Sequence, residues 1–208
     1  MKPQWLKWAR DLESVAQNGR HYAKDHYEIQ RYETVRRIAA EILATKFDAP
    51  ASDIERLLAL EQGHATPKVD VRGVVIRGSQ ILLVKESKDG GWTLPGGWAD
   101  ANEAPSEAVE RETREESGFT VKAVRLLALL DRDRQADAPP FPFHVYKAFF
   151  LCEITGGEAK PSNETDEVAF FSEAEVPGLA FSTARTTSRQ LERFFQMSRT
   201  GDWTPWFD

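Results

Sequence analysis

The sequence has few of the features that mark secreted or membrane proteins. Its single cysteine, Cys152, cannot form an internal disulfide and lies in an apolar segment, so we expect a buried structural thiol. No apolar run reaches the length of about 18 residues that a transmembrane helix requires. The N-terminal residues also lack the apolar segment and cleavage site of a signal peptide. These absences predict a soluble, cytoplasmic protein.

Positive charge is also scarce. The chain has 27 Lys and Arg residues against 33 Asp and Glu residues, a formal net charge of −6. A large nucleic-acid-binding surface needs clustered Lys and Arg, so we expect none, although a local basic pocket for a small phosphorylated ligand is compatible with this balance. The length of 208 residues and the 41% hydrophobic content predict one domain with a smaller addition.

Residues 1–62 are expected to form the smaller domain, which is all helical. Apolar positions recur at helical spacing in three stretches, 5–16, 25–44 and 52–60. Asn18-Gly19 is expected to end the first helix, and Ser52 is expected to cap the third. Three short helices cannot bury all their aromatic side chains, which predicts packing on the second domain or dimerisation. A linker follows at 63–67.

From Val69 onward the apolar pattern changes to that of strands. The expected strands are 69–76, 81–85, 120–130, 144–154 and 167–171. The first two form a hairpin, residues 131–143 form a long loop, Gly156-Gly157 makes a turn, and residues 182–198 form a closing helix. This order predicts a second domain at 68–208 that combines strands and helices.

The helix expected between Pro105 and Gly118 carries the chemistry. Pro suits a first helical position and Gly the residue just past the end. Glu112, Glu115 and Glu116 lie at i, i+3 and i+4, so their carboxylates share one helical face. Their mutual repulsion needs a positive partner, for which Mg²⁺ or Mn²⁺ is the natural candidate. The alternative is a solvated acidic face.

The segment from Gly97 to Phe119 resembles the signature of the Nudix hydrolases. Five residues separate Gly97 from Glu103, seven more precede Arg111-Glu112, and the pattern closes with Glu115-Glu116 and Gly118. Two positions that the family usually fills with aliphatic residues hold Thr113 and Phe119, which affects packing and leaves the acidic residues intact. The resemblance implies an α/β (α+β) fold, the Nudix-type α/β/α sandwich with a mixed sheet, preceded here by the small helical domain.

The resemblance also implies roles for individual residues. The metal ligands would be the Gly96 carbonyl and the three carboxylates already named. Glu103 would pair with Arg111, which would hold a metal-binding carboxylate; the alternative is that Arg111 reaches the substrate. The general base would be a signature glutamate, Glu115 or Glu116, or a later acid, Glu164 or Glu167, for which an ordinary exposed loop acid is the alternative.

Most candidate substrate contacts lie outside the signature. Arg132, Arg134 and Lys147 could meet phosphates, and His144 could meet a phosphate or leaving group or be an ordinary strand-end histidine. Trp98 could stack on a nucleobase, whereas core packing is favoured for Trp92.

The phrases at 144–147 and 181–186 look like a branch with a helical N-terminal domain, similar to CDP-choline or ADP-ribose pyrophosphatases. We therefore expect a metal-dependent hydrolase that cleaves the pyrophosphate of a nucleoside diphosphate linked to another moiety, acting as a homodimer. The proline that marks ADP-ribose enzymes is absent near Arg132-Asp133-Arg134, which favours CDP-choline-like substrates and leaves ADP-ribose as the second choice. The alternatives are sanitation of oxidised nucleoside triphosphates and a non-catalytic nucleotide-sensing module.

Overall fold

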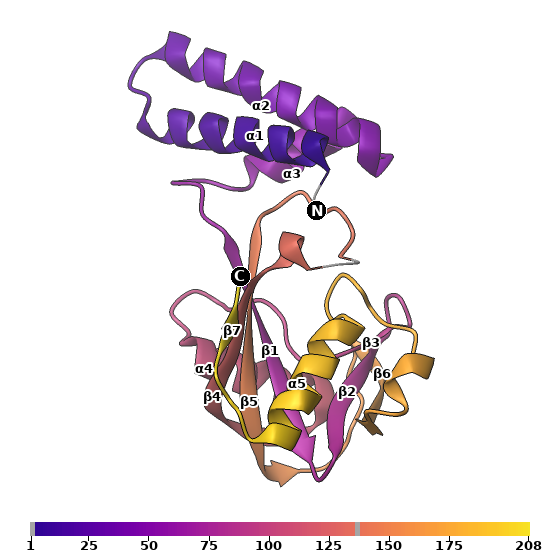
Figure 1. Cartoon of the computed structure of the whole chain (residues 1–208). Coiled ribbons are helices and arrows are strands. Elements are labelled where there is room, and N and C mark those ends of the chain that lie inside the picture. Colours follow the sequence, from indigo (N-terminus) through magenta and orange to yellow (C-terminus); the bar gives the residue numbers. More distant parts are fainter. Residues whose placement is uncertain (1–2, 136–137) are drawn as a thin grey trace. The chain divides into compact units, whose positions relative to one another are not determined.

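The computed structural model of the chain describes residues 3–135 and 138–208, which divide into two units. The helical unit comprises the residues up to Pro67 together with Pro140–His144, and the sheet unit comprises Lys68–Pro139 and Val145–Asp208. Figure 1 shows the elements of both units. The helical unit has one hydrophobic core cluster, and the sheet unit has two. No helix among the described residues is long and apolar enough to cross a membrane.

The helical unit contains three helices, α1 (Gln4–Tyr22), α2 (His26–Phe47) and α3 (Ala51–Ala59). The expected end of the first helix at Asn18-Gly19 is wrong, because α1 continues through Gly19 to Tyr22. A Cβ on Gly19 would lie 2.2 Å from the ring of Tyr32 on α2. This glycine therefore permits close packing of two helices and does not terminate one.

The expected cap of the third helix is also wrong. α3 begins at Ala51, directly after Pro50, which has no side chain able to cap. The Ser52 hydroxyl instead donates to Asp53 at 3.4 Å. α2 does begin at a true cap, since the Asp25 carboxylate accepts hydrogen bonds from the backbone N–H groups of Tyr27 and Glu28.

The sheet unit is built on a mixed sheet with the strand order β3-β2-β1-β5-β4-β7, and β6 pairs with β2. Its strands are β1 (Lys68–Arg77), β2 (Gln80–Glu86), β3 (Trp92–Thr93), β4 (Phe119–Asp131), β5 (Val145–Gly157), β6 (Thr165–Ser172) and β7 (Trp206–Phe207). The pairs β1–β5 and β4–β7 are parallel, and the others are antiparallel.

Two helices cover the sheet, α4 (Pro105–Ser117) and α5 (Ser188–Thr200), and two short 3₁₀ helices, η1 (Arg132–Arg134) and η2 (Val176–Gly178), lie in loops. α4 contributes Ala108 and Val109 to one core cluster, and α5 contributes Leu191 and Phe194 to the other. Two separate cores, one for each helix, give the layered arrangement of Figure 1. The predicted mixed α/β fold with a helical N-terminal region is confirmed.

The local predictions for the sheet unit met different outcomes. The hairpin is confirmed, since Arg77 pairs with Gln80 around a two-residue turn. The turn at Gly156-Gly157 is wrong, because both glycines pair with β4 at the end of β5. The closing helix is shorter than expected: Thr187 caps α5, so residues 181–186 form a loop that becomes part of the site.

Candidate active site

A turn at Pro95–Gly97 is held against β1 by backbone hydrogen bonds. The N–H of Val71 donates to the carbonyl of Gly97, and the N–H of Gly73 donates to the carbonyl of Pro95, both at 2.8 Å. Gly96 has a φ of 142°, and a Cβ there would lie 2.0 Å from the Val71 carbonyl oxygen. Only glycine permits this approach, so the turn can lie directly against β1.

α4 brings two glutamates to this turn. As predicted, the helix starts at Pro105, and Gly118, which has a φ of 79°, follows directly after its last residue. Glu116 is buried and its Oε2 accepts a hydrogen bond from the N–H of Gly96 at 2.8 Å. The Glu112 carboxylate lies so close to Gly97 that a Cβ there would come within 2.8 Å of Oε2. The carboxylates of these two α4 residues thus lie directly against the backbone of the turn.

Arg111 joins the remaining acids of the signature. Its Nε and Nη2 each donate to Glu103 at 2.9 Å, which is a bidentate contact. Its Nη1 donates to Glu112 at 2.7 Å and to Glu115 at 3.2 Å. A planar guanidinium can serve three carboxylates in this way, whereas an ammonium group acts as a single point charge. Of these acids Glu115 is the most exposed.

The site concentrates negative charge in a poorly solvated place. Burial raises the pKa of Glu116 to about 7, although Arg72 and the Gly96 N–H oppose the shift. Burial likewise raises the pKa of Glu112, against the attraction of Arg111. Carboxylates held together while burial disfavours their charge fit a hard divalent cation, which would restore their ionised forms. Glu112, Glu115, Glu116 and the Gly96 carbonyl are the groups that could hold it.

A buried ionic cluster lies on β1 and β5 beside the turn. Arg72 binds Asp70 in a bidentate contact at 2.9 and 2.7 Å, and its Nη1 donates to the carbonyl of Leu94 at 3.1 Å. Lys147 pairs with Asp70 at 3.1 Å. Burial lowers the pKa of Lys147 to about 8, while Arg72 and Lys147 overcome the effect of burial on Asp70 and hold its pKa below the usual value.

The candidate substrate contacts differ in their burial and in the groups that they meet. Lys147 and Arg132 are buried, and each donates to a backbone carbonyl of the 181–186 loop. Arg134 is exposed, and His144 belongs to the helical unit. Trp98 is half-exposed. It lies beside Arg111, since its carbonyl accepts a hydrogen bond from Arg111 Nη2 at 3.4 Å. Only Trp98 of these five therefore stands exposed next to the carboxylates.

The two loop acids proposed as bases also differ. Glu164 is exposed and precedes β6 directly. Glu167 lies within β6 and forms an ion pair with Lys85 at 2.6 Å. The ion pair restrains the Glu167 side chain, and no ion pair among the described residues restrains that of Glu164, so Glu164 is the less constrained of the two.

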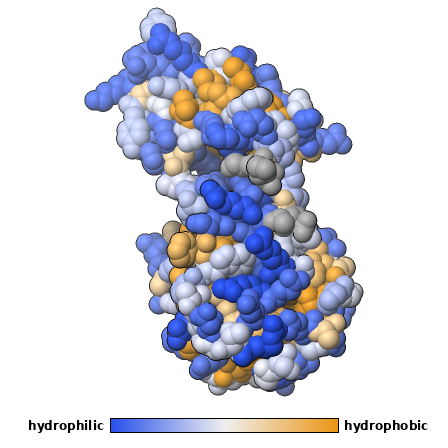
Figure 2. All heavy atoms as spheres, in the orientation of Figure 1, coloured by the Kyte–Doolittle hydropathy of each residue, from blue (hydrophilic) through white to orange (hydrophobic). Residues whose placement is uncertain are grey.

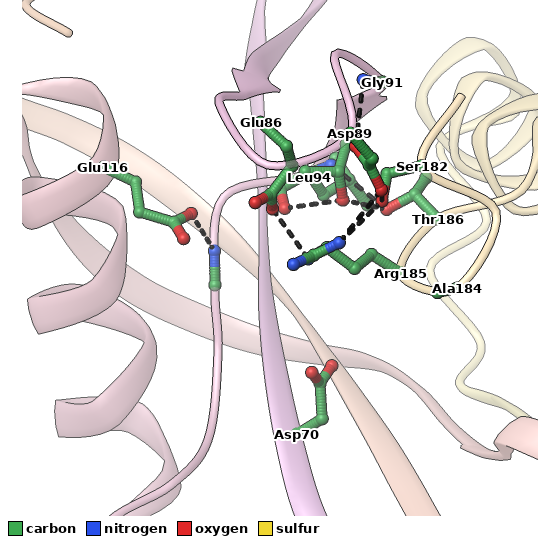
Figure 3. A network of polar contacts seen from close by, with 12 residues as sticks. Asp70, Glu86, Asp89, Gly91, Leu94, Glu116, Ser182, Ala184, Arg185 and Thr186 are labelled. Atoms are coloured by element: carbon green, nitrogen blue, oxygen red, sulfur yellow. Dashed lines mark hydrogen bonds and ion pairs between the residues drawn. The ribbon is translucent and has the colours of Figure 1, made fainter. Parts of the chain in front are cut away.

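A third polar group was missed by the sequence analysis. Arg185 forms an ion pair with Glu86 at 2.8 Å and a hydrogen bond to Asp89 at 3.3 Å (Figure 3). Burial raises the pKa of Glu86, a shift that Arg185 and Arg72 oppose. Two sequence signals could have pointed here: the charged pair Asp70 and Arg72 inside an apolar strand, and the polar 181–186 phrase, to which no role was given.

Two family models match the chain. Residues 66–194 match the NUDIX domain, and residues 3–58 match a model described as the UDP-X-like, N-terminal oligomerisation domain. The chain is 40% identical over 211 residues to the putative ADP-ribose pyrophosphatase YjhB of Bacillus subtilis, with 100% of this chain and 99% of the relative covered.

Solved structures agree with this similarity. An ADP-ribose pyrophosphatase from Streptococcus suis is 37% identical, with 69% of this chain and all of that chain covered and a TM-score of 0.61. A structure of UDP-X diphosphatase is 26% identical, with 98% of both chains covered and the same TM-score. The second match includes the N-terminal helices as well as the sheet unit.

Proposed function

We propose a pyrophosphohydrolase function for this chain, which belongs to the Nudix hydrolases. In this proposal the chain cleaves the pyrophosphate bond of a nucleoside diphosphate linked to another moiety. The observation that carries the proposal is the cluster of carboxylates at the Pro95–Gly97 turn, called the catalytic turn below. There Glu116 accepts a hydrogen bond from the N–H of Gly96, and Glu112 lies against Gly97. Arg111 holds Glu112 and Glu115 beside it. We further propose these three glutamates and the Gly96 carbonyl as the ligands of Mg²⁺ or Mn²⁺.

The chain's own groups have distinct tasks in this proposal. Arg111, braced by Glu103, orients two of the ligand carboxylates. Arg72 places positive charge behind Glu116 and braces the turn through the carbonyl of Leu94. A divalent cation, when bound, supplies charge neutralisation at the diphosphate and a more acidic water. Glu164, the less constrained of the two loop acids, is the proposed general base outside the helix.

The preferred substrate differs from the one favoured by the sequence. The prediction of a CDP-choline-like substrate rested on a missing proline, and none of the relatives described above is named for CDP-choline. ADP-ribose and UDP-X compounds are named for relatives that cover most or all of this chain. We therefore propose ADP-ribose or a UDP-linked compound as substrate. Sanitation of triphosphates and a non-catalytic sensor role are less favoured.

A substrate screen tests the proposal. The full-length protein is incubated with ADP-ribose, UDP-glucose, CDP-choline or an oxidised nucleoside triphosphate, each with Mg²⁺ or Mn²⁺, and the products are identified by mass. The expected products are a nucleoside monophosphate and a sugar phosphate. Faster cleavage of the triphosphate would instead support sanitation. Binding without turnover, seen by calorimetry, would support the sensor.

We also propose that the helical unit, residues 1–62 of the sequence, pairs two copies of the chain. Trp8, Val15 and Tyr22 repeat every seven residues along α1 and are 57%, 56% and 64% exposed. Residues at this spacing share one helix face, and Leu12 lies on it between Trp8 and Val15. Figure 2 shows apolar residues gathered among hydrophilic ones on this unit. A helical seam of this kind suits a two-fold interface.

The oligomeric state tests this second proposal. Val15→Glu places a charge in the middle of the α1 stripe and should shift the full-length protein from dimer toward monomer in light scattering. Glu55→Gln is a control at a partly exposed position of α3. A monomeric wild-type protein, or a Val15→Glu variant that stays dimeric, would contradict the assignment of this face.

A further inference from the structure

The loop at Phe181–Thr186 is fixed by buried side chains from other elements. Arg132 Nε donates to the carbonyl of Ala184 at 3.3 Å, and Lys147 Nζ donates to the carbonyl of Arg185 at 2.6 Å. Both cations are buried. The backbone of the loop therefore has anchors that do not involve the Arg185 side chain.

The same loop is joined to the strand that leads into the catalytic turn. Thr186 Oγ1 accepts from the N–H of Leu94 at 3.1 Å and lies 2.8 Å from the hydroxyl of Thr93. Thr93 and Leu94 immediately precede Pro95–Gly97. The loop thus has a defined position relative to the catalytic turn, and any side chain that it presents is preorganised.

Arg185 is the side chain so presented. It is 27% exposed, with Nε 2.8 Å from Glu86 Oε1, and its Nη1 donates to Asp89 at 3.3 Å and to the Ser182 hydroxyl at 2.8 Å. Of the residues that the structure describes, none accepts a hydrogen bond from Nη2. Since the loop has other anchors, the Nη2 group of this partly exposed guanidinium remains available as a hydrogen-bond donor to a ligand.

The group lies close to the catalytic carboxylates. Glu86 is buried at the end of β2, and its charge interacts with Arg72, which also interacts with Glu116. In Figure 3 the guanidinium of Arg185 faces Glu86, and the charge of Glu86 in turn influences the pKa of Glu116. A ligand at the carboxylate site would therefore have this group among its neighbours.

The charge of the group indicates what it would bind. One guanidinium faces two carboxylates, Glu86 and Asp89, so its charge is already balanced by its own partners and is not free to pair with a diphosphate. The trio offers donors and acceptors side by side, which match an uncharged polar edge. We propose that Arg185, with Glu86 and Asp89, binds such an edge of the substrate, on the nucleobase or on the sugar of the linked moiety, and thereby determines which derivative is cleaved. This rests on the proposed pyrophosphohydrolase function.

Kinetics of Arg185→Met on a matched substrate panel test the inference. ADP-glucose and UDP-glucose differ only in the base, whereas ADP-ribose and ADP-glucose share the base and differ in the linked sugar and in its point of attachment. Loss of hydrogen bonds from a charged group should raise KM by roughly tenfold to a hundredfold, with kcat nearly unchanged. A KM effect that depends on the base assigns the edge to the nucleobase. An effect that depends on the sugar assigns it to the linked moiety.

Controls separate recognition from structural support. Arg199→Gln removes another arginine of the sheet unit that is ion-paired with a glutamate, Glu173, and should leave every KM unchanged. Asp89→Asn keeps the shape of the trio and should alter the ratio of KM values between substrates as Arg185→Met does. A uniform loss of kcat across the panel, or an equal rise in the inhibition constant of inorganic pyrophosphate, would overturn the inference.

Calorimetry in metal-free buffer keeps this test independent of turnover. Wild-type protein should bind ADP-ribose or UDP-glucose more tightly than the Arg185→Met variant does. If the wild type cleaves no member of the panel, the proposed function fails, while a difference in these affinities would still support the role of Arg185. Equal affinities of the two proteins for every compound would refute that role, whatever the enzyme cleaves.

Discussion

Replacing Thr113 by valine should stabilise the sheet unit. Thr113 lies on α4 at a signature position and is fully buried, and its Oγ1 has no hydrogen-bond partner among the described residues. It faces Gly73 of β1, where a Cβ would come within 2.5 Å of that oxygen. A hydroxyl buried without a partner costs about 1–3 kcal/mol, and valine has nearly the same shape.

We therefore expect Thr113→Val to raise the free energy of unfolding by about 1–2 kcal/mol. For a chain of this length that corresponds to a rise in Tm of roughly 3 °C per kcal/mol. Urea unfolding of the full-length protein, followed by tryptophan fluorescence, measures the change. Turnover should be unaffected, because the substitution leaves the Glu112, Glu115 and Glu116 carboxylates in place.

Thr113→Ser is the matched control. Serine keeps the unpaired hydroxyl and loses the buried methyl group, so it should lower stability by about 1 kcal/mol. The reasoning would be refuted if the valine variant were no more stable than wild type. That result would mean that the hydroxyl has a partner, such as a buried water, or that Gly73 cannot accommodate a methyl group.

Three further predictions concern other sites. Glu116→Gln should lower kcat at least about a hundredfold while the fold persists, because the amide oxygen can still accept from the turn; Glu110→Gln on the same helix should stay active. Gly19→Ala should destabilise the helical unit by about 1–3 kcal/mol, measured by circular dichroism, since its Cβ would overlap Tyr32. Burial raises the pKa of Glu13 to about 7 from 4.5, so the folded state binds this proton more tightly than the unfolded chain. Binding of this proton therefore stabilises the folded helical unit fully below pH 4.5, and the stabilisation is lost as the pH rises through 7. Hydrogen exchange of α1 and α2 measures this stability, and its pH dependence should be weaker in Glu13→Gln.

Features set by neighbours along the chain could be read from the sequence. The bounds of α4, with Pro105 at its start and Gly118 after its end, follow from local backbone preferences. The helical period alone predicts that Glu112, Glu115 and Glu116 share a face. The hairpin after β1 was predictable for the same reason, because its turn residues lie between two apolar runs.

Features that depend on segments distant in the chain could not be predicted. Gly19 looks like a helix end until Tyr32, thirteen positions later, is seen to pack against it. Lys147 is a candidate phosphate ligand by its residue type, and only folding brings it to Asp70 and the carbonyl of Arg185. In each case the residue type suits more than one role, and the tertiary contact could not be foreseen from it.

The sequence by itself determined that three carboxylates lie on one helical face behind a glycine-rich turn, because both depend on short-range spacing. Only the tertiary structure decided what surrounds them. It placed Arg72 behind Glu116 and brought Arg185 to Glu86, pairs separated by 44 and 99 positions, as the residue numbers show. Hydrogen bonds and ion pairs act over a few ångströms in space, so chain distance carries no information about which charges will meet.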